Sequence, residues 1–151
     1  MKALVYTKPN EVVYRDEPDP APGEGQVLVK IEASGICGSD MHAYRGHDPR
    51  RVPPLILGHE VAGSVASGGR KGERVVINPL MTCGMCAYCE SGRTNLCTTR
   101  ELIGMRVAGA YCEYVAISEQ NLVPIPGSFD MVKASLAEPA ACALHTLNRA
   151  R

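Results

Sequence analysis

Four closely spaced cysteines are the residues in this sequence whose types and spacing point most directly to chemistry. They are Cys83, Cys86, Cys89 and Cys97, separated by two gaps of two residues and one of seven. Such gaps allow one loop to place four thiolates around a single ion. Thiolates favour zinc, or iron in some settings. Because four protein ligands leave no open coordination position, we expect a structural zinc site that orders a segment with few apolar residues.

A disulfide pair, free thiols and an iron–sulfur cluster are the alternatives for these cysteines. The chain has seven cysteines, an odd number, and its first residues, MKALVYTKPN, lack the apolar core of a secretory signal. In the cytoplasm, where we expect this protein, a metal site is favoured over a disulfide framework. The spacing also differs from the common cysteine runs of iron–sulfur proteins.

A second, looser set of residues combines Cys37, His59 and Glu138, each next to an expected strand or helix. A thiolate, an imidazole and a carboxylate make a plausible catalytic zinc set, with one position left for water or substrate. Taken singly, none of them is diagnostic, because a lone cysteine is usually a core residue and a lone histidine is usually structural. The combination predicts the metal centre.

Three motifs resemble those of the medium-chain, zinc-dependent alcohol and polyol dehydrogenases. In chain order they are Cys37-Gly-Ser-Asp-Met-His42, Gly58-His-Glu-Val-Ala-Gly63 and the Cys83–Cys97 spacing. The resemblance covers nearly the whole chain. It implies a mainly β chain with short helices, folded as a GroES-like, partly open β-barrel with a zinc-stapled lobe.

The resemblance also implies a set of zinc ligands. It carries over Cys37 and His59 as ligands of a catalytic zinc, and Glu60 as an occasional ligand that exchanges with water. Glu138 stands where the alcohol dehydrogenases proper carry a third cysteine ligand. A carboxylate there resembles the sorbitol, threonine and sugar dehydrogenase branches.

The reaction that the resemblance implies is oxidation of a secondary alcohol, polyol or sugar, with NAD or NADP as hydride acceptor. Zinc lowers the pKa of a bound hydroxyl, and hydride then leaves the carbinol carbon for the nicotinamide. Ser39 is placed to accept the hydroxyl proton, and His42 is placed to deliver it to solvent, since histidine is the residue type whose ordinary pKa lies near neutrality. Asp40 is placed to orient His59. Ordinary loop polarity is the alternative for Ser39, Asp40 and His42.

Short strands are predicted for most of the chain that must hold these residues. The clearest is 26–33, in which Val27, Val29 and Ile31 alternate onto one face. Apolar residues recur at helical spacing from Phe129 onward. Pro139 would break one long helix, so we expect it at the first position of a second helix. The other predicted strands are 3–6, 12–14, 60–65, 74–77, 111–117 and 122–125.

The expected division of the chain is a GroES-like catalytic domain over residues 1–127, which includes the structural-zinc lobe 79–100, and a helical segment over 128–151. That segment would lead toward a nucleotide-binding domain. A dinucleotide site needs a glycine-rich turn between a strand and a helix, and Gly68-Gly69 does not match it. We therefore expect the Rossmann domain to be absent from this chain.

Charge and hydropathy exclude other classes of partner. Lys+Arg and Asp+Glu number 16 each, which gives no field to attract nucleic acid or an anionic membrane. The apolar runs are too short to span a bilayer. We expect a small-molecule alcohol or polyol as substrate and a homo-oligomer when the protein is full length. The alternative function is a truncated, inactive module that binds zinc or a partner.

Several reactive residue types are interpreted as structural. Cys112 and Cys142 fit buried packing positions, and His145 is expected to be a structural residue of the terminal helix. His47 and Asp48 are expected in a solvated loop.

Overall fold

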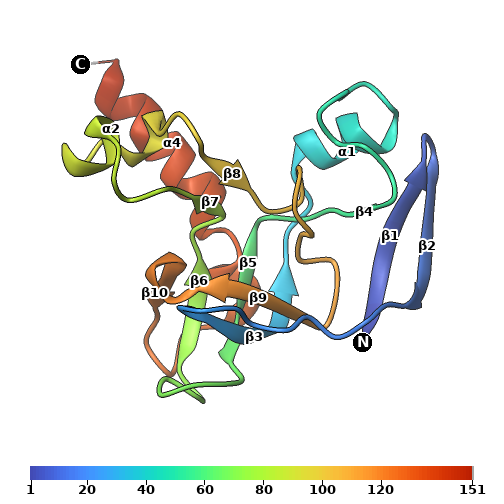
Figure 1. Cartoon of the computed structure of the whole chain (residues 1–151), viewed down its shortest axis with the longest axis horizontal. Helices are drawn as coiled ribbons and strands as arrows, with labels where there is room; N and C mark the ends of the chain where they lie inside the picture. Colours follow the sequence, from blue (N-terminus) through green and yellow to red (C-terminus); the bar gives the residue numbers. More distant parts are fainter. Residues whose placement is uncertain (151) are drawn as a thin grey trace.

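A five-stranded antiparallel sheet lies at the centre of the computed structural model, which describes residues 1–150 (Figure 1). Its strand order is β10-β6-β5-β3-β9, so strands distant in sequence lie side by side. The strands are β3 (Gln26–Ser34), β5 (Val61–Val65), β6 (Arg74–Ile77), β9 (Tyr114–Ser118) and β10 (Leu122–Pro124).

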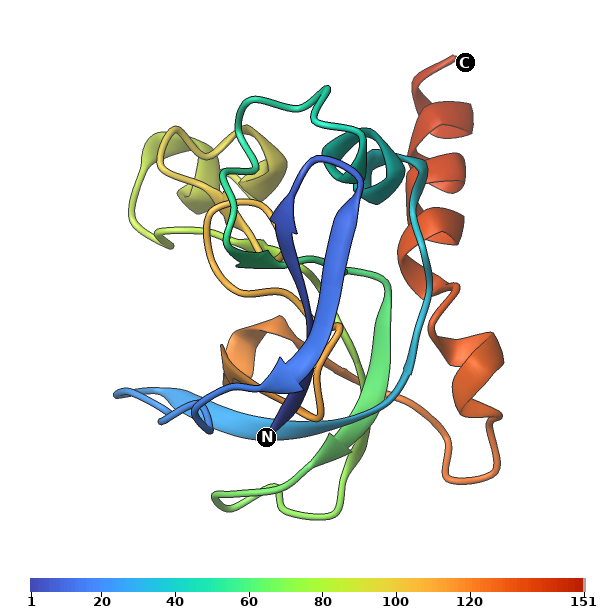
Figure 2. The same cartoon turned by 90° about the vertical axis from the view of Figure 1, so that its right-hand side faces the viewer.

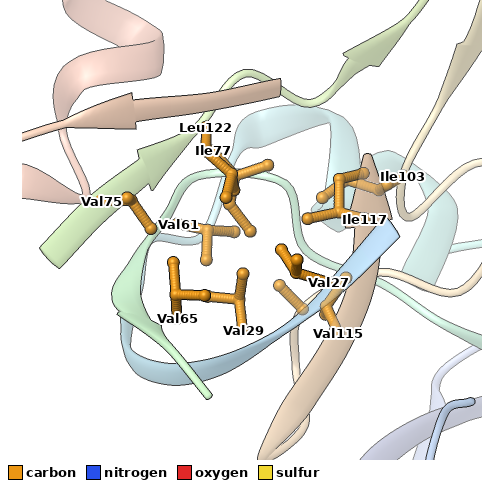
Figure 3. Packing of buried hydrophobic residues seen from close by; sticks show 11 residues of the cluster. Val27, Val29, Val61, Val65, Val75, Ile77, Ile103, Val115, Ile117 and Leu122 are labelled. Atoms are coloured by element: carbon orange, nitrogen blue, oxygen red, sulfur yellow. The ribbon is translucent and has the colours of Figure 1, made fainter. Parts of the chain in front are cut away.

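The sheet curls around an apolar interior built largely from β-branched side chains. Val27 and Val29 of β3 are fully buried, as the predicted alternation requires. Figure 3 shows them meeting Val61 and Val65 of β5 and Ile117 of β9 in one cluster. Each such side chain contributes roughly 1.5–3 kcal/mol when it leaves water. The cluster therefore provides the rigid support on which the neighbouring loops rest.

A smaller sheet, of order β2-β1-β4, leads the chain toward the Gly58-His59-Glu60 turn. It consists of β1 (Lys2–Lys8), β2 (Glu11–Asp16) and β4 (Leu55–Ile56), and Val5 pairs with Ile56. Helix α1 (Gly38–Tyr44) packs beside this sheet, and its Ala43 is buried against Tyr6 and Leu57.

The four-cysteine segment forms a lobe with little regular structure. A two-stranded ladder of β7 (Leu80–Met81) and β8 (Glu101–Leu102) closes its base. Between these strands lie only the short helix α2 (Ala87–Glu90) and the 3-10 turn η1 (Thr94–Leu96). Only Cys97 is buried between residues 83 and 100. Apolar packing therefore contributes little to the order of this lobe.

Two helices follow the last strand, after the turn η2 (Glu119–Asn121) and β10. They are α3 (Met131–Ala134) and α4 (Ala137–Arg149), and Figure 2 shows them along one side of the molecule. The predicted break between two helices is confirmed, but Pro139 is the third residue of α4, not the first. It still lies in the first turn, where backbone N–H groups have no intrahelical acceptor.

Other expectations need correction. The predicted strand 111–117 begins only at Tyr114, although Cys112 forms an isolated bridge with Ala3.

Every ladder between the named strands is antiparallel. Residues 1–150 therefore contain no doubly wound parallel sheet.

None of the helices in residues 1–150 has the length and apolar character needed to cross a lipid bilayer.

Candidate metal centres

The four clustered cysteines converge as their spacing predicts. Their sulfur atoms all lie within 4.8 Å of one another. The Sγ–Sγ distances are 3.5 Å for Cys86–Cys89, 3.6 Å for Cys83–Cys97 and 3.9 Å for Cys83–Cys89. Sulfurs held about 2.3 Å from a tetrahedral zinc lie about 3.8 Å apart, whereas a disulfide needs about 2.05 Å. The geometry fits an ion and no disulfide forms within residues 1–150.

The electrostatics of this cluster also fit a cation. The backbone N–H of Cys83, 3.5 Å from Cys97 Sγ, lowers the pKa of the Cys97 thiol to about 6. Burial and hydrogen bonding to neighbouring thiols raise the pKa of Cys89 to about 11. The protein alone thus favours some thiolates and disfavours others. A central dication would lower the pKa of all four thiols, because a thiol that coordinates a metal gives up its proton.

A second group of potential ligand atoms comes from two segments, the loop before helix α1 and the turn before strand β5. Atoms of Cys37, His59 and Glu60 lie within 4.8 Å of one another. Cys37 immediately precedes α1, and Glu60 immediately precedes β5. The backbone N–H of Gly35 donates a 2.8 Å hydrogen bond to the Glu60 carbonyl and joins the two segments.

Asp40 stands behind this group and connects its parts. It is 2% exposed, and its carboxylate accepts hydrogen bonds from the Cys37 N–H at 3.2 Å and the Tyr111 hydroxyl at 2.8 Å. A weaker contact of 3.4 Å comes from the Gly58 N–H. Although burial raises the pKa of Asp40, its interactions with His59 and Tyr111 lower it below the ordinary value. A charged carboxylate is therefore held beside the imidazole.

His59 supplies the test of whether a metal fits here. It is 4% exposed, and Nδ1 lies 3.6 Å from Asp40 Oδ1, which is too long for a hydrogen bond. Nδ1 is thus a buried polar atom without a hydrogen-bond partner in the part of the chain described. Interaction with Asp40, opposed by burial, raises the pKa of His59 to about 9. A small inward shift would give the carboxylate–histidine–metal arrangement that orients a metal-bound imidazole.

Glycines let the backbone pack tightly around the turn before His59. Gly58 has φ +95°, and a Cβ there would lie 2.6 Å from the Tyr111 ring. Gly104 and Gly109 approach the same turn, and a Cβ on either would meet the Gly58 carbonyl at 2.8 Å or 2.5 Å. Side chains larger than glycine would displace the turn that aims His59.

Glu138 lies outside the 4.8 Å group formed by Cys37, His59 and Glu60. It sits in the first turn of α4 and accepts a 3.2 Å hydrogen bond from the Cys142 thiol. That bond is the largest cause of a raised pKa at Cys142, and the charges of Cys37 and Glu60 add to it. The prediction that Cys142 is buried is wrong, because it is exposed. No residue of α4 is buried in the part of the chain that the structure describes.

The two predicted proton-relay residues are placed differently from each other. Ser39 is half-buried in α1, and its Oγ accepts a 3.2 Å hydrogen bond from Arg51. His42 is exposed, and its ring centroid lies 6.4 Å from that of His47. No hydrogen bond joins Ser39 to His42 within residues 1–150, so the relay between them stays a prediction.

Sequence reasoning missed three residues that support these positions. Tyr111 and Arg51 are not identified as supports from the sequence, and Asp48 is expected in a solvated loop although it is 9% exposed. Arg51 is also buried, at 3%. Tyr111 bonds to Asp40 and Arg51 bonds to Gly104, each tens of residues away, so no local spacing indicates them. Asp48 bonds to its near neighbours Arg50 and Arg51, but the sequence does not show that this loop is buried. The predicted placement of His47 in solvent and of Cys112 against the core agrees with the structure. His145, expected to be structural, is exposed on α4.

Comparison with known proteins now bears on this arrangement. The sequence family described as the alcohol dehydrogenase GroES-like domain matches residues 23–127. An uncharacterized zinc-type alcohol dehydrogenase-like protein of Haemophilus influenzae is 39% identical over 99% of this chain and 46% of its own length. L-Galactonate-5-dehydrogenase of Escherichia coli is 36% identical over 99% of this chain and 46% of its own length.

A solved structure extends the likeness to three dimensions. It is described as a short chain alcohol dehydrogenase from E. coli in complex with NADH, and it superposes with a TM-score of 0.85 at 36% identity. The match covers 92% of this chain and 42% of that one. The chain therefore spans about half the length of the relatives it matches. The Haemophilus influenzae protein is described as zinc-type, the E. coli structure holds NADH, and a solved structure from Sinorhizobium meliloti is described as a zinc-binding dehydrogenase bound to NADP.

The matched region contains the Cys37, His59 and Glu60 group and all four clustered cysteines, so the fold, the sites and the sequence agree. This chain belongs to the alcohol dehydrogenase GroES-like domain family, within the medium-chain zinc-dependent alcohol dehydrogenases.

Proposed function

We propose that this chain is the zinc-binding catalytic domain of an NAD(P)-dependent dehydrogenase that oxidises a secondary alcohol, polyol or sugar. The observation that carries the proposal is the convergence of Cys37, His59 and Glu60 in front of the buried Asp40. A thiolate, an imidazole and a carboxylate with a supporting acid suit a zinc that keeps a position open. The names of relatives such as L-galactonate-5-dehydrogenase and sorbitol dehydrogenase support a polyhydroxylated substrate.

When bound, zinc would lower the pKa of a substrate hydroxyl, and the nicotinamide would accept the hydride. The chain's own residues then have separate tasks. Cys37 and His59 hold the ion, and Glu60 or Glu138 supplies the carboxylate. Asp40 would orient the imidazole of His59 once the 3.6 Å separation from Nδ1 closes to hydrogen-bond length.

Proton release is the second task that we assign. Ser39 Oγ accepts the proton of the substrate hydroxyl as its own proton departs, so the serine stays neutral. His42 passes that proton to solvent, for which its imidazole and its exposure suit it. This route supports catalysis because an alcohol buried in a closed site has no direct exchange with water.

The four clustered cysteines have a structural role in this proposal. We infer that Cys83, Cys86, Cys89 and Cys97 bind a second zinc that has no open position and takes no part in the reaction. We also keep the division into a catalytic domain over residues 1–127 and a helical segment from 128 that leads to a cofactor domain. A cytoplasmic homo-oligomer, without nucleic-acid or membrane partners, completes the proposal.

Two measurements test this function. Metal analysis of the purified protein is expected to give two zinc ions per chain, one of which exchanges readily. The full-length gene product is then screened with polyols against simple alcohols and with both nicotinamide cofactors. A single tightly held metal would favour an inactive zinc-binding module. Activity that survives Cys37→Ala would refute the mechanism.

A further inference from the structure

Arg51 is a buried cation that no part of the proposed reaction explains. Its side chain is 1% exposed, although burial of an isolated charge is strongly unfavourable. The guanidinium is satisfied by three acceptors on three separate segments. Nη1 donates to Asp48 Oδ2 at 2.6 Å, Nε donates to the Gly104 carbonyl at 2.8 Å, and Nη2 donates to Ser39 Oγ at 3.2 Å.

These three bonds connect segments that lie next to the Cys37, His59 and Glu60 group. Gly104 packs against the Gly58 turn that precedes His59, and Ser39 lies two residues after Cys37. Asp48 neutralises the guanidinium and is itself held by Arg50 on its solvent side. The planar fork of an arginine can address three acceptors in fixed directions, which the point charge of a lysine cannot do.

The bond to Ser39 sets what that hydroxyl can do next. A serine hydroxyl has one proton to donate and two lone pairs to accept with. Arg51 occupies one lone pair. One lone pair is left for the proton of a substrate hydroxyl, and the serine O–H is left to donate onward. Without Arg51 the hydroxyl could rotate and place its own proton toward the substrate.

We propose that Arg51 is a positioning residue that fixes the Ser39 hydroxyl in the orientation needed to relay the substrate proton. The inference rests on the proposed function and deepens it. The guanidinium keeps all its protons throughout. Each turnover moves one proton onto Ser39 Oγ and one proton off it, so no charge remains on the serine.

Arg50 offers a matched control for Arg51. It is the neighbouring arginine, it binds the same Asp48 through Nε at 2.8 Å and Nη2 at 3.0 Å, and its side chain is 60% exposed. It makes no contact with Ser39 among the hydrogen bonds of residues 1–150. Arg50→Gln is expected to keep kcat within about twofold, as most surface substitutions do.

The first test is a double-mutant cycle in kcat on the full-length, zinc-loaded protein. Ser39→Ala is expected to lower kcat by about 10²–10⁴-fold, as loss of an acid–base step does. Arg51→Gln is expected to lower kcat by at least about tenfold in the parent protein and by less than about twofold in the Ser39→Ala background. Equal factors in both backgrounds would show a general structural role and overturn the inference.

The second test needs no activity and uses this chain alone. Unfolding equilibrium constants in urea are measured for the parent, Ser39→Ala, Arg51→Gln and the double variant. If the two side chains are in contact, the change in the unfolding constant of the double variant should differ from the product of the two single changes by a factor of about three to ten. Effects that multiply would show that Arg51 and Ser39 are not coupled and would overturn the proposal.

Arg51→Gln leaves Asp48 buried without one of its partners, and this variant can fail to fold. Two double variants replace it in that case. Asp48→Asn/Arg51→Gln removes both charges, and Asp48→Asn/Arg50→Gln keeps Arg51. Ser39→Ala is expected to cost much more kcat in the second background than in the first. Equal costs would overturn the inference while leaving the dehydrogenase assignment intact. An inactive parent protein would overturn the dehydrogenase assignment and the inference with it.

Discussion

The Tyr111 hydroxyl donates a 2.8 Å hydrogen bond to Oδ2 of Asp40, whose other oxygen lies 3.6 Å from Nδ1 of His59. Burial raises the pKa of Tyr111 well above its usual value, so the hydroxyl stays protonated and can donate. The same tyrosine ring packs against the Gly58 turn. One side chain thus fixes both the carboxylate behind the histidine and the backbone in front of it.

Tyr111→Phe is therefore expected to loosen the predicted catalytic metal site. Loss of the hydroxyl leaves a buried carboxylate oxygen short of a donor, which costs about 1–3 kcal/mol of unfolding free energy. Support of this kind is typically worth about 10–100-fold in metal affinity. Urea unfolding and zinc competition titration measure the two effects. Tyr44→Phe, which removes a hydroxyl bonded to the Asn10 carbonyl at the surface, is the control. Equal zinc affinities for the two variants would contradict the prediction.

The Gly58 turn can be tested against Gly72, which has a similar backbone conformation but no neighbour. The comparison separates the cost of backbone strain from the cost of a steric clash with Tyr111. Gly58 has φ +95° and Gly72 has φ +89°, but a Cβ on Gly72 would meet nothing within 4 Å. Gly72→Ala is expected to cost about 1–2 kcal/mol through its left-handed backbone alone. Gly58→Ala adds the collision with Tyr111, worth about 1–3 kcal/mol more. Thermal or urea unfolding compares the pair, and similar losses would show that the ring moves aside without cost.

The sheet and the metal groups were predictable because their signals are local. The alternation of Val27 and Val29 follows from the two-residue period of a strand, and the four cysteines fit one loop around one ion. Cys37 and His59 were assigned from short motifs that the Asp40 network holds together.

The supports of the site were missed for a physical reason. In the sequence Arg51 is one of two adjacent arginines, and only the structure shows that it is buried and bonded to Gly104 and Ser39. Cys142 looks like a core residue because α4 has an apolar spacing, yet none of that helix is buried in residues 1–150. Burial is decided by what packs on a segment, and sequence spacing does not reveal it.

Removal of the metal from the four-cysteine cluster is expected to disorder the lobe and to spare the central sheet. The lobe has almost no buried apolar side chains, so metal–thiolate bonds would supply most of its folding energy. A chelator, or Cys89→Ser, should expose residues 79–100 to limited proteolysis while the cluster around Val29 stays protected. Cys112→Ser, outside both candidate metal groups, is the control. Cleavage within the sheet at the same rate would show that the lobe and the barrel unfold together.

The Asp48 carboxylate predicts how stability changes with pH. Hydrogen bonds from Arg50, opposed by burial and helped by Arg51, hold the pKa of Asp48 well below its usual range. A carboxylate with a depressed folded-state pKa stabilises the protein above its unfolded pKa, about 3.9, and loses that contribution as pH falls toward the folded value. Asp48→Asn should therefore cost about 1–3 kcal/mol near pH 7, and the difference from the parent should shrink below about pH 4. Glu73→Gln, which breaks a partly exposed pair with Arg70, is the control and should change stability less at every pH. Urea unfolding from pH 3 to 8 measures both variants, and a pH-independent difference for Asp48→Asn would show that its charge is not what stabilises the loop.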